Sequence, residues 1–321
     1  MKHKIYQLIW AKIESEFEQL PKIKTVYYAP TELLHLIPFV GIGNESGVLG
    51  KRYQMIQLST VGKLIHGLSE PDWNTTVLYG GIEYQLDTSV FTDSIQKNDV
   101  NADFTKTDYI WSYLPGTESE IRTIQKILIK KDKNVQVYSS SIATENAIKS
   151  MSGHSPAVLH LATHGFFYSE SDEKKNNVFS ESKDPLLRSG LILAGANHAW
   201  VNGMNPYQTE DGILTAAEIS VLDLSNTDLV VLSACETGLG DITKTEGVYG
   251  LQRAFKMAGV DIIIMSLWQV PDQETAEFMS LFYSKWSKGM GVRESFRYAQ
   301  NKMYKKYPND PNKWAGFILL E

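Results

Sequence analysis

The sequence predicts an α/β fold in which a mostly parallel sheet is covered by helices on both faces. The first observation is a pair of continuous apolar runs, LVVLSA at 229–234 and DIIIMSL at 261–267, which are typical of strands buried on both faces. The second is their alternation with helical segments such as GVYGLQRAFKMAG at 247–259 and ETAEFMSLFYSKWSKG at 274–289. Strands that alternate with helices favour parallel pairing, because a helical crossover returns the chain to the same edge of the sheet.

The first part of the chain is predicted to hold one helix and three strands. Apolar residues at helical spacing predict an amphipathic N-terminal helix with one face formed by Ile5, Leu8, Ile9, Ile13 and Phe17. A strand-like run with turns at Pro30 and Pro38 follows, and two short strands are expected at 53–58 and 76–79. The polar, weakly periodic segment 82–109 is the predicted internal seam.

The remaining elements start near residue 114. Thr117 and Glu120 have the T-x-x-E spacing of a capping box ahead of the helical run 121–131, and another helix is expected from Thr144. Strands are also predicted at 135–139, 156–165 and 189–195, a turn with a helix at 211–223, and a last helix at 291–307.

Composition excludes several classes of function. The chain has 321 residues, 43% of them hydrophobic and 21% charged, as in ordinary globular proteins with a sizeable core. Its net charge of -6 argues against a general nucleic-acid binder. No stretch approaches the roughly 20 apolar residues of a membrane span. A single cysteine permits no internal disulfide, so a reducing cytosol is the expected compartment.

The single cysteine stands where a reactive group is expected in a parallel sheet. Cys235 ends an apolar strand and precedes a glycine-rich loop, and His164 ends the predicted strand 156–165. Reactive groups collect at the carboxyl ends of parallel strands. If the two strands are neighbours, an imidazole and a thiol meet at one edge, as thiol hydrolysis requires. Gly165 allows a sharp turn, and its N–H can face a reacting carbonyl oxygen. The alternative for Cys235 is a small buried apolar filler.

Two other kinds of site fit the residues less well. His160 and His164 have the i, i+4 spacing of a zinc helix, and Cys235 could add a sulfur ligand. In a strand, four residues span about 13 Å, which is too far for one ion, so His160 is expected to be a packed or hydrogen-bonded core histidine. The loop CETGLGDITKTEG lacks the residue order of a phosphate-binding loop. No metal and no cofactor are predicted.

Two motifs resemble those of a known family. VLHLATHGFF at 158–167 and LVVLSACETGLG at 229–240 are similar to the paired motifs of CHAT-domain proteins, which belong with caspases, gingipains and separases. Further segments resemble family blocks in family order: YLPGTESEI, SGLILAG, DGILTAAEISVLDL, EGVYGLQRAFKMAGV, SLWQVPDQETAEFM and WAGFILL. With the opening segment, the resemblance runs from about Ile5 to Leu320.

The resemblance implies a caspase-like cysteine protease. It assigns a degenerate, pseudo-caspase-like half to residues 1–108 and a catalytic half to residues 109–321. His164 is then the base and Cys235 the nucleophile, and the N–H groups of Gly165 and Cys235 are the oxyanion donors of a reaction that passes through an acyl-enzyme. No third member of a triad is required, and the sequence offers none.

Substrate preference is suggested by acidic residues. Separase-like relatives have acids in the segment that reads SLWQVPDQET here, and they cleave after Arg or Lys. Asp272 and Glu274 are therefore candidates for the floor of a pocket for a basic residue, with helix capping as the alternative role. Asp211 is a further candidate for the cleft, with a turn as the alternative.

The charged segment 169–188 departs from the usual family spacing. A solvated mobile loop is the default interpretation. The sharper alternative is that this segment gates the cleft, or that it is itself cut at Lys174, Lys175 or Arg188 during activation.

The resemblance also implies a biological setting. The expected protein is a bacterial, cytosolic endopeptidase that stays latent until a partner arrives and serves defence or cell death. Its partners would be a protein substrate, such as a gasdermin-like pore former, and a regulatory protein or an N-terminal repeat region outside this sequence, with no direct binding to nucleic acid or membrane. The alternatives are a catalytically silent caspase-like scaffold or binding module, and a zinc-dependent hydrolase that uses His160, His164 and Cys235.

Overall fold

A large sheet organises the structure, a computed structural model that describes residues 2–17, 20, 22–67, 70–71, 73–85, 111–168, 179, 181–202, 210–233 and 246–321. Within these residues the sheet has eight strands, and sheets of three and two strands accompany it. The strands of the large sheet are, in spatial order, β1 (Thr25–Tyr28), β4 (Gln54–Gln57), β13 (Phe317–Leu320), β12 (Ile262–Ser266), β11 (Leu229–Leu232), β7 (Val158–Leu161), β5 (Thr75–Ile82) and β6 (Asn134–Ser140).

Strand pairing in the large sheet is parallel except at one position. β7 pairs in parallel with β5 and β11, and β11 pairs in parallel with β12. β13 runs antiparallel to β12 and parallel to β4, so it joins the strands near the N-terminus to the rest of the sheet. The predicted mostly parallel α/β fold is confirmed. The division at residue 108 stays a prediction, and strands from both sides of it share this sheet.

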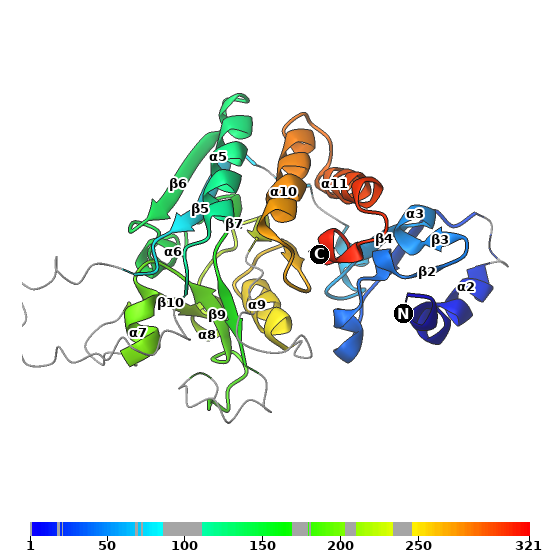
Figure 1. Ribbon diagram of the computed structural model, residues 1–321, viewed down its shortest axis with the longest axis horizontal. Helices are drawn as coiled ribbons and strands as arrows, with labels where there is room; N and C mark the ends of the chain where they lie inside the picture. The colour runs from blue at the N-terminus through cyan, green and yellow to red at the C-terminus, as the bar shows by residue number, and fades with distance from the viewer. Residues whose placement is uncertain are drawn as a thin grey trace, which may run out of the picture.

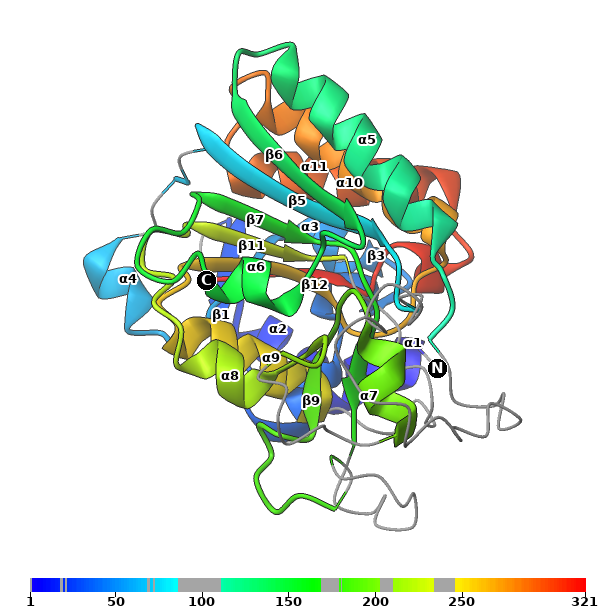
Figure 2. The same ribbon diagram turned by 90° about the vertical axis from the view of Figure 1, so that its left-hand side faces the viewer.

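Helices cover both faces of the sheet (Figure 1 and Figure 2). One face carries α5 (Pro115–Ile129), α10 (Asp272–Trp286) and α11 (Val292–Lys306), and the other carries α6 (Glu145–Lys149), α8 (Ala216–Ser220) and α9 (Glu246–Met257). Side chains of the central strands alternate between the two layers. In β11, Leu229 and Val231 join the core under α10, and Val230 and Leu232 join the core under α9. This alternation explains why the strand reads as a continuous apolar run.

Shorter elements complete the described chain. They are α1 (Lys2–Ile5), the π-helical η1 (Tyr6–Trp10), α2 (Ala11–Phe17), the 3₁₀ helices η2 (Glu32–Leu36), η3 (Phe39–Gly41) and η7 (Pro311–Lys313), α3 (Leu49–Arg52), α4 (Lys63–His66), α7 (Ala196–Asn202), the pair β2 (Gly43–Asn44) and β3 (Gly47–Val48), and the antiparallel β8 (Gly165–Phe167), β9 (Ser189–Ile192) and β10 (Ile213–Thr215).

The N-terminal helix buries a different face from the predicted one. Tyr6 and Trp10 are buried, whereas Leu8 and Ile13 are 84% and 43% exposed, so the predicted apolar face is wrong at those two positions. The π-helical turn at Tyr6–Trp10 is the physical reason. A π turn bonds i to i+5 rather than i to i+4, and this shifts the side chains relative to a regular α-helical spacing.

The capping box predicted at Thr117 and Glu120 is wrong. The helix α5 begins earlier, with Pro115 in its first turn and Leu114 as the cap residue. Thr117 instead donates from Oγ1 to the Leu114 carbonyl oxygen at 2.7 Å and accepts from the N–H of Gly81 at 2.9 Å. Glu120 therefore does not cap the helix, and it is buried, with 3% exposure.

Two predicted segments contain more elements than expected. The predicted strand at 156–165 is two strands, because β7 ends at Leu161 and β8 starts at Gly165 in a different sheet. The predicted turn before the helix at 211–223 contains β10, and a capping box between Thr215 and Glu218 starts α8 directly after it. Most of the predicted seam at 82–109 lies outside the described residues.

Among the described residues, no helix has both the length and the apolar character needed to cross a membrane.

Close contact between α5 and β5 makes Gly80 a sensitive position. A Cβ atom at Gly80 would lie 2.8 Å from both Ile121 Cγ2 and the Thr117 carbonyl oxygen. We therefore expect Gly80→Ala to lower the free energy of unfolding by about 1–3 kcal/mol through overpacking, measured by urea denaturation. The control is Gly62→Ala, whose Cβ would meet nothing closer than 3.7 Å and should change stability by less than about 1 kcal/mol. Equal effects of the two substitutions would contradict the prediction.

Candidate functional site

The carboxyl ends of β7 and β11 lie side by side at the centre of the large sheet. Each residue of β7 faces the residue 71 positions later in β11, from Val158 with Leu229 to Leu161 with Leu232. The pairing continues one residue further, since the N–H of Ser233 donates to the Leu161 carbonyl oxygen at 3.0 Å. The sequence-based condition that these two strands be neighbours is therefore met. Cys235, two residues after Ser233, lies outside the described residues.

His164 lies in the short connection from β7 to β8 and is 1% exposed. Its ring packs between Tyr84, at 4.9 Å between centroids, and Trp111, at 5.0 Å. Nε2 lies 2.7 Å from the carbonyl oxygen of Ser112. Because a carbonyl oxygen only accepts hydrogen bonds, Nε2 carries a proton, and in the neutral ring Nδ1 is then the basic nitrogen.

Hydrogen bonds also fix the backbone next to His164. The Thr163 hydroxyl contacts the Tyr84 hydroxyl at 3.0 Å and donates to the Ile192 carbonyl oxygen. The N–H of Ile192 donates to the His164 carbonyl oxygen at 2.9 Å. The imidazole is thus held by its own ring contacts and by the strands on either side of it.

Gly165 is the first residue of β8 and faces Leu191 of β9. The bonds from Ile192 to His164 and from Tyr168 to Arg188 mark the hydrogen-bonded positions of this antiparallel pair. Gly165 falls between such positions, so its N–H points away from β9. Its φ is not in the left-handed region, and a Cβ atom would meet nothing closer than the Gly190 carbonyl oxygen at 3.5 Å. The expected sharp turn is therefore not what requires glycine here.

A small polar cavity opens beside the ends of β7 and β11. It has a volume of about 20 Å³ and is lined by Thr163 and Ser233 on the sheet side and by Asp272 and Glu120 on the helix side. Asp272 lies in the first turn of α10, and a Cβ atom at Gly116 would come within 2.6 Å of the Asp272 Cβ. Only glycine therefore allows this close approach of α5 to α10.

Glu274 does not reach this cavity. It is 7% exposed, and Lys313 Nζ bonds its Oε1 at 2.6 Å. The structure thus separates the two acids of the segment, bringing Asp272 next to the strand ends and pairing Glu274 with a lysine. Sequence spacing could not distinguish them, because the difference lies in which helix face each residue occupies.

His160 is a buried, bonded core residue, as expected. It is 0% exposed, Nε2 lies 2.9 Å from Glu120 Oε1, and Nδ1 lies 3.2 Å from the Tyr283 hydroxyl. Burial first, and the Glu120 charge second, hold the pKa of Tyr283 well above its usual range. No group of three or more His, Cys, Asp or Glu residues is placed to hold a metal ion within the described ranges.

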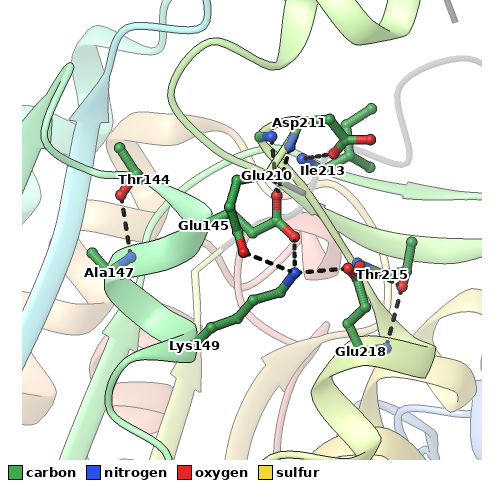
Figure 3. A network of polar contacts seen from close by, with 10 residues as sticks. Thr144, Glu145, Ala147, Lys149, Glu210, Asp211, Ile213, Thr215 and Glu218 are labelled. Carbon is green, nitrogen blue, oxygen red and sulfur yellow. Dashed lines mark hydrogen bonds and ion pairs between the residues drawn. The ribbon is translucent and has the colours of Figure 1, made fainter. Parts of the chain in front are cut away.

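Asp211 belongs to a network of acids around one lysine (Figure 3). Its Oδ1 accepts from the N–H of Ile213 at 2.9 Å, which is the turn role that was the alternative for this residue. Glu145 Oε2 accepts from the N–H groups of Asp211 and Gly212, each at 3.1 Å. Lys149 pairs with Glu145 at 2.6 Å, and also with Glu210 and Glu218. Burial raises the pKa of Asp211 above its usual value and that of Glu145 to about 7.

Part of the predicted processing segment is described. Arg188 is 3% exposed, and its N–H donates to the Pro185 carbonyl oxygen. Its own carbonyl oxygen accepts from the N–H of Tyr168, the residue that directly follows β8. Cleavage at Arg188 would therefore require the β8–β9 connection to open. Lys174 and Lys175 lie outside the described residues.

The fold defines a class of protein. A central, mostly parallel sheet between two helix layers is the fold of caspase-like cysteine proteinases. Two solved structures share it: gingipain R, an Arg-specific cysteine proteinase, with a TM-score of 0.52 and 11% identity over 96% of this chain and 65% of that one, and the complex of pro- and mature domains of RgpB from Porphyromonas gingivalis, with a TM-score of 0.53 and 13% identity over 99% and 70%.

The CHAT domain family model matches residues 2–321, and the chain belongs to that family. Curated relatives include tetratricopeptide repeat protein 28 of Homo sapiens, 27% identical over 229 residues, and its counterpart in Mus musculus, 36% identical over 221 residues. Each match covers 66% of this chain and 9% of the relative, so the chain spans less than a tenth of the length of these relatives.

The raised pKa of Glu145 predicts a dependence of stability on pH. The folded state favours the protonated carboxyl group, so this contribution is present near pH 4.5 and is lost as the pH rises through about 7. Glu145→Gln keeps an acceptor for the two N–H groups and cannot ionise. Between pH 5 and pH 7.5, we expect the wild type to lose on the order of 2 kcal/mol more stability than this variant, measured by urea denaturation.

The control for this comparison is Glu277→Gln, which removes an exposed pair with Lys306 and should leave the pH dependence as in the wild type. Parallel stability curves for the wild type and Glu145→Gln would show that the fold does not favour the protonated carboxyl group.

Proposed function

We propose that this protein is a cysteine endopeptidase with His164 as base and Cys235 as nucleophile. The observation that carries the proposal is the oriented imidazole at the shared end of β7 and β11. His164 follows Leu161 by three residues, and Cys235 follows the partner residue Leu232 by the same number. Two residues of chain span at most about 7 Å, and the proposal therefore requires only that Cys235 stay within this distance of Ser233 at the same edge.

The chemistry follows from the tautomer of His164. Nε2 is committed to the Ser112 carbonyl oxygen, so Nδ1 takes the thiol proton. The thiolate attacks the peptide carbonyl carbon, the oxyanion is stabilised by the N–H groups of Gly165 and Cys235, and the C–N bond breaks as the imidazolium returns its proton to the leaving amine. A water molecule, deprotonated by the same nitrogen, then hydrolyses the thioester and restores the thiol.

A preference for a basic residue before the cleaved bond is the second part of the proposal. Asp272 and the buried Glu120 both line the cavity next to Thr163 and Ser233. Asp272 is exposed, and its carboxylate suits an Arg or Lys side chain, since charge-assisted hydrogen bonds to a guanidinium or ammonium group are about twice as strong as neutral ones. Glu274 contributes less, because Lys313 already neutralises it.

Latency is supported by the burial of the base. His164 is 1% exposed and is covered by the rings of Tyr84 and Trp111, so a polypeptide needs a rearrangement to reach it. We infer that a protein partner or a repeat region supplies this rearrangement, and that segment 169–188 takes part in it. A role in bacterial defence or cell death, with a gasdermin-like substrate in the cytoplasm, remains part of this proposal.

The dyad is tested with a thiol-reactive peptide probe and a fluorogenic peptide library. Cys235→Ala abolishes labelling, and Cys235→Ala or His164→Ala lowers turnover at least about 1,000-fold. His154→Ala, which changes an exposed histidine, leaves both unchanged. A folded wild type that neither labels nor cleaves, with or without candidate partners, would favour the alternative of a catalytically silent scaffold.

The pocket charge is tested with Asp272→Asn, which keeps the side-chain size beside Gly116. For peptides with Arg or Lys before the cleaved bond, we expect kcat/KM to fall about 30-fold or more, whereas peptides with a neutral residue there change little. Glu277→Gln alters another acid of α10, which is half-buried and paired with Lys306, and should have no such effect. A uniform loss for all peptides would refute the role of Asp272 in specificity.

A further inference from the structure

The carbonyl group that orients His164 belongs to a short strap of backbone, residues Trp111 and Ser112, which lies outside helices and strands. A strap without regular hydrogen bonding does not hold a carbonyl oxygen in place by itself. Its two residues precede Pro115, where α5 begins. The precise position of the Ser112 carbonyl group therefore depends on what fixes the residue next to it.

The side chain of Asn197, in α7, fixes Trp111 through hydrogen bonds to both its N–H and its carbonyl oxygen. The N–H of Trp111 donates to Asn197 Oδ1 at 2.9 Å, and Asn197 Nδ2 donates to the Trp111 carbonyl oxygen at 3.0 Å. Asn197 is 2% exposed, so both bonds are formed away from water. A side-chain amide has one donor group and one acceptor group on the same carbon, which lets it pair with both polar groups of one residue as a neighbouring strand would.

Asn197 also bonds to the backbone of Tyr84, whose ring is the second that packs against His164. The N–H of Asn197 donates to the Tyr84 carbonyl oxygen at 3.1 Å, and the rings of Tyr84 and Trp111 lie at 4.9 and 5.0 Å from the imidazole. One residue of α7 thus holds the backbone of both aromatic neighbours of His164. The indole of Trp111 also meets Trp200 of the same helix at 5.0 Å.

We propose that Asn197 is a positioning residue for His164, acting through the Trp111–Ser112 strap. By holding the strap, it keeps the Ser112 carbonyl oxygen on Nε2 and leaves Nδ1 as the basic nitrogen. Its part in catalysis rests on the proposed function, whereas its control of the imidazole tautomer does not. Without the two bonds from Asn197 to Trp111, the Ser112 carbonyl oxygen moves away from His164 Nε2. The neutral ring is then a mixture of two tautomers, protonated at Nε2 or at Nδ1.

The tautomer is measured by nitrogen NMR of the full chain labelled at histidine, in a Cys235→Ala background at alkaline pH. The signal of His164 is assigned from its loss in His164→Gln. The Cys235→Ala protein is expected to show a ring protonated at Nε2 alone. Adding Asn197→Leu, which removes both bonds to Trp111, is expected to move both ring-nitrogen shifts toward those of a tautomer mixture. Adding Asn197→Asp, which keeps the acceptor and loses the donor, gives a smaller shift in the same direction.

Turnover provides the second measurement, with Cys235 restored. Misplacement of the base predicts that Asn197→Leu lowers kcat about 100-fold while KM changes less than twofold. The matched control is Gln300→Leu, which removes another buried amide, bonded through Nε2 to the Phe317 carbonyl oxygen at 3.1 Å. It tests whether loss of a buried hydrogen bond elsewhere has the same effect, and it should change neither the tautomer nor kcat.

An unchanged His164 tautomer in folded Asn197→Leu and Asn197→Asp proteins overturns the proposal, and so does an equal change in Gln300→Leu. If the tautomer responds as expected but the wild type cleaves no peptide with or without candidate partners, the positioning role stands and the protease function fails. If the wild type is active and the tautomer responds while kcat does not, the catalytic part of the proposal is refuted.

Discussion

The parallel pairing of β7 with β11 is the constraint on which the rest of the structure depends. All residues of both strands are buried, and their backbone groups have no water to bond, so pairing with neighbouring strands must satisfy them. A slip of one residue would exchange Val230 and Leu232 with Leu229 and Val231 between the two cores, which are built from different side chains. The register is therefore fixed, and with it the positions at which both strands end.

Much of this framework follows from local sequence. Runs such as LVVL and IIIMS have no polar face, so they predict central strands, and their alternation with amphipathic helices predicts parallel pairing. The errors have specific causes. The π turn at Tyr6–Trp10 changes the phase of the first helix, Pro115 starts α5 ahead of the apparent cap, and the chain changes sheets between Leu161 and Gly165 without a proline or a polar run to mark the break.

The supports of the site are less accessible to sequence reasoning than its reactive residues. His164 and Gly165 stand out because an imidazole and a glycine at a strand end have few structural reasons to be there. The Ser112 contribution is a backbone carbonyl oxygen, which any residue could provide, so no side chain signals it. Asn197 and Glu120 come from helices far from His164 in sequence, and both residue types are common on exposed surfaces. Only the tertiary contacts distinguish them.

Orientation of His164 and access to it depend on neighbouring but separable contacts. Asn197 and Trp200 lie three residues apart on α7 and so share a helix face, on which the amide holds the strap and the indole packs against Trp111. Trp200 in turn stacks on Phe179, with centroids 5.6 Å apart and an interplanar angle of 19°. Moving α7 as a whole would break the bonds that orient the base. Displacing Phe179 would loosen the aromatic cover and leave those bonds intact, so a rearrangement that admits substrate without losing the base is expected to act on the side of residue 179.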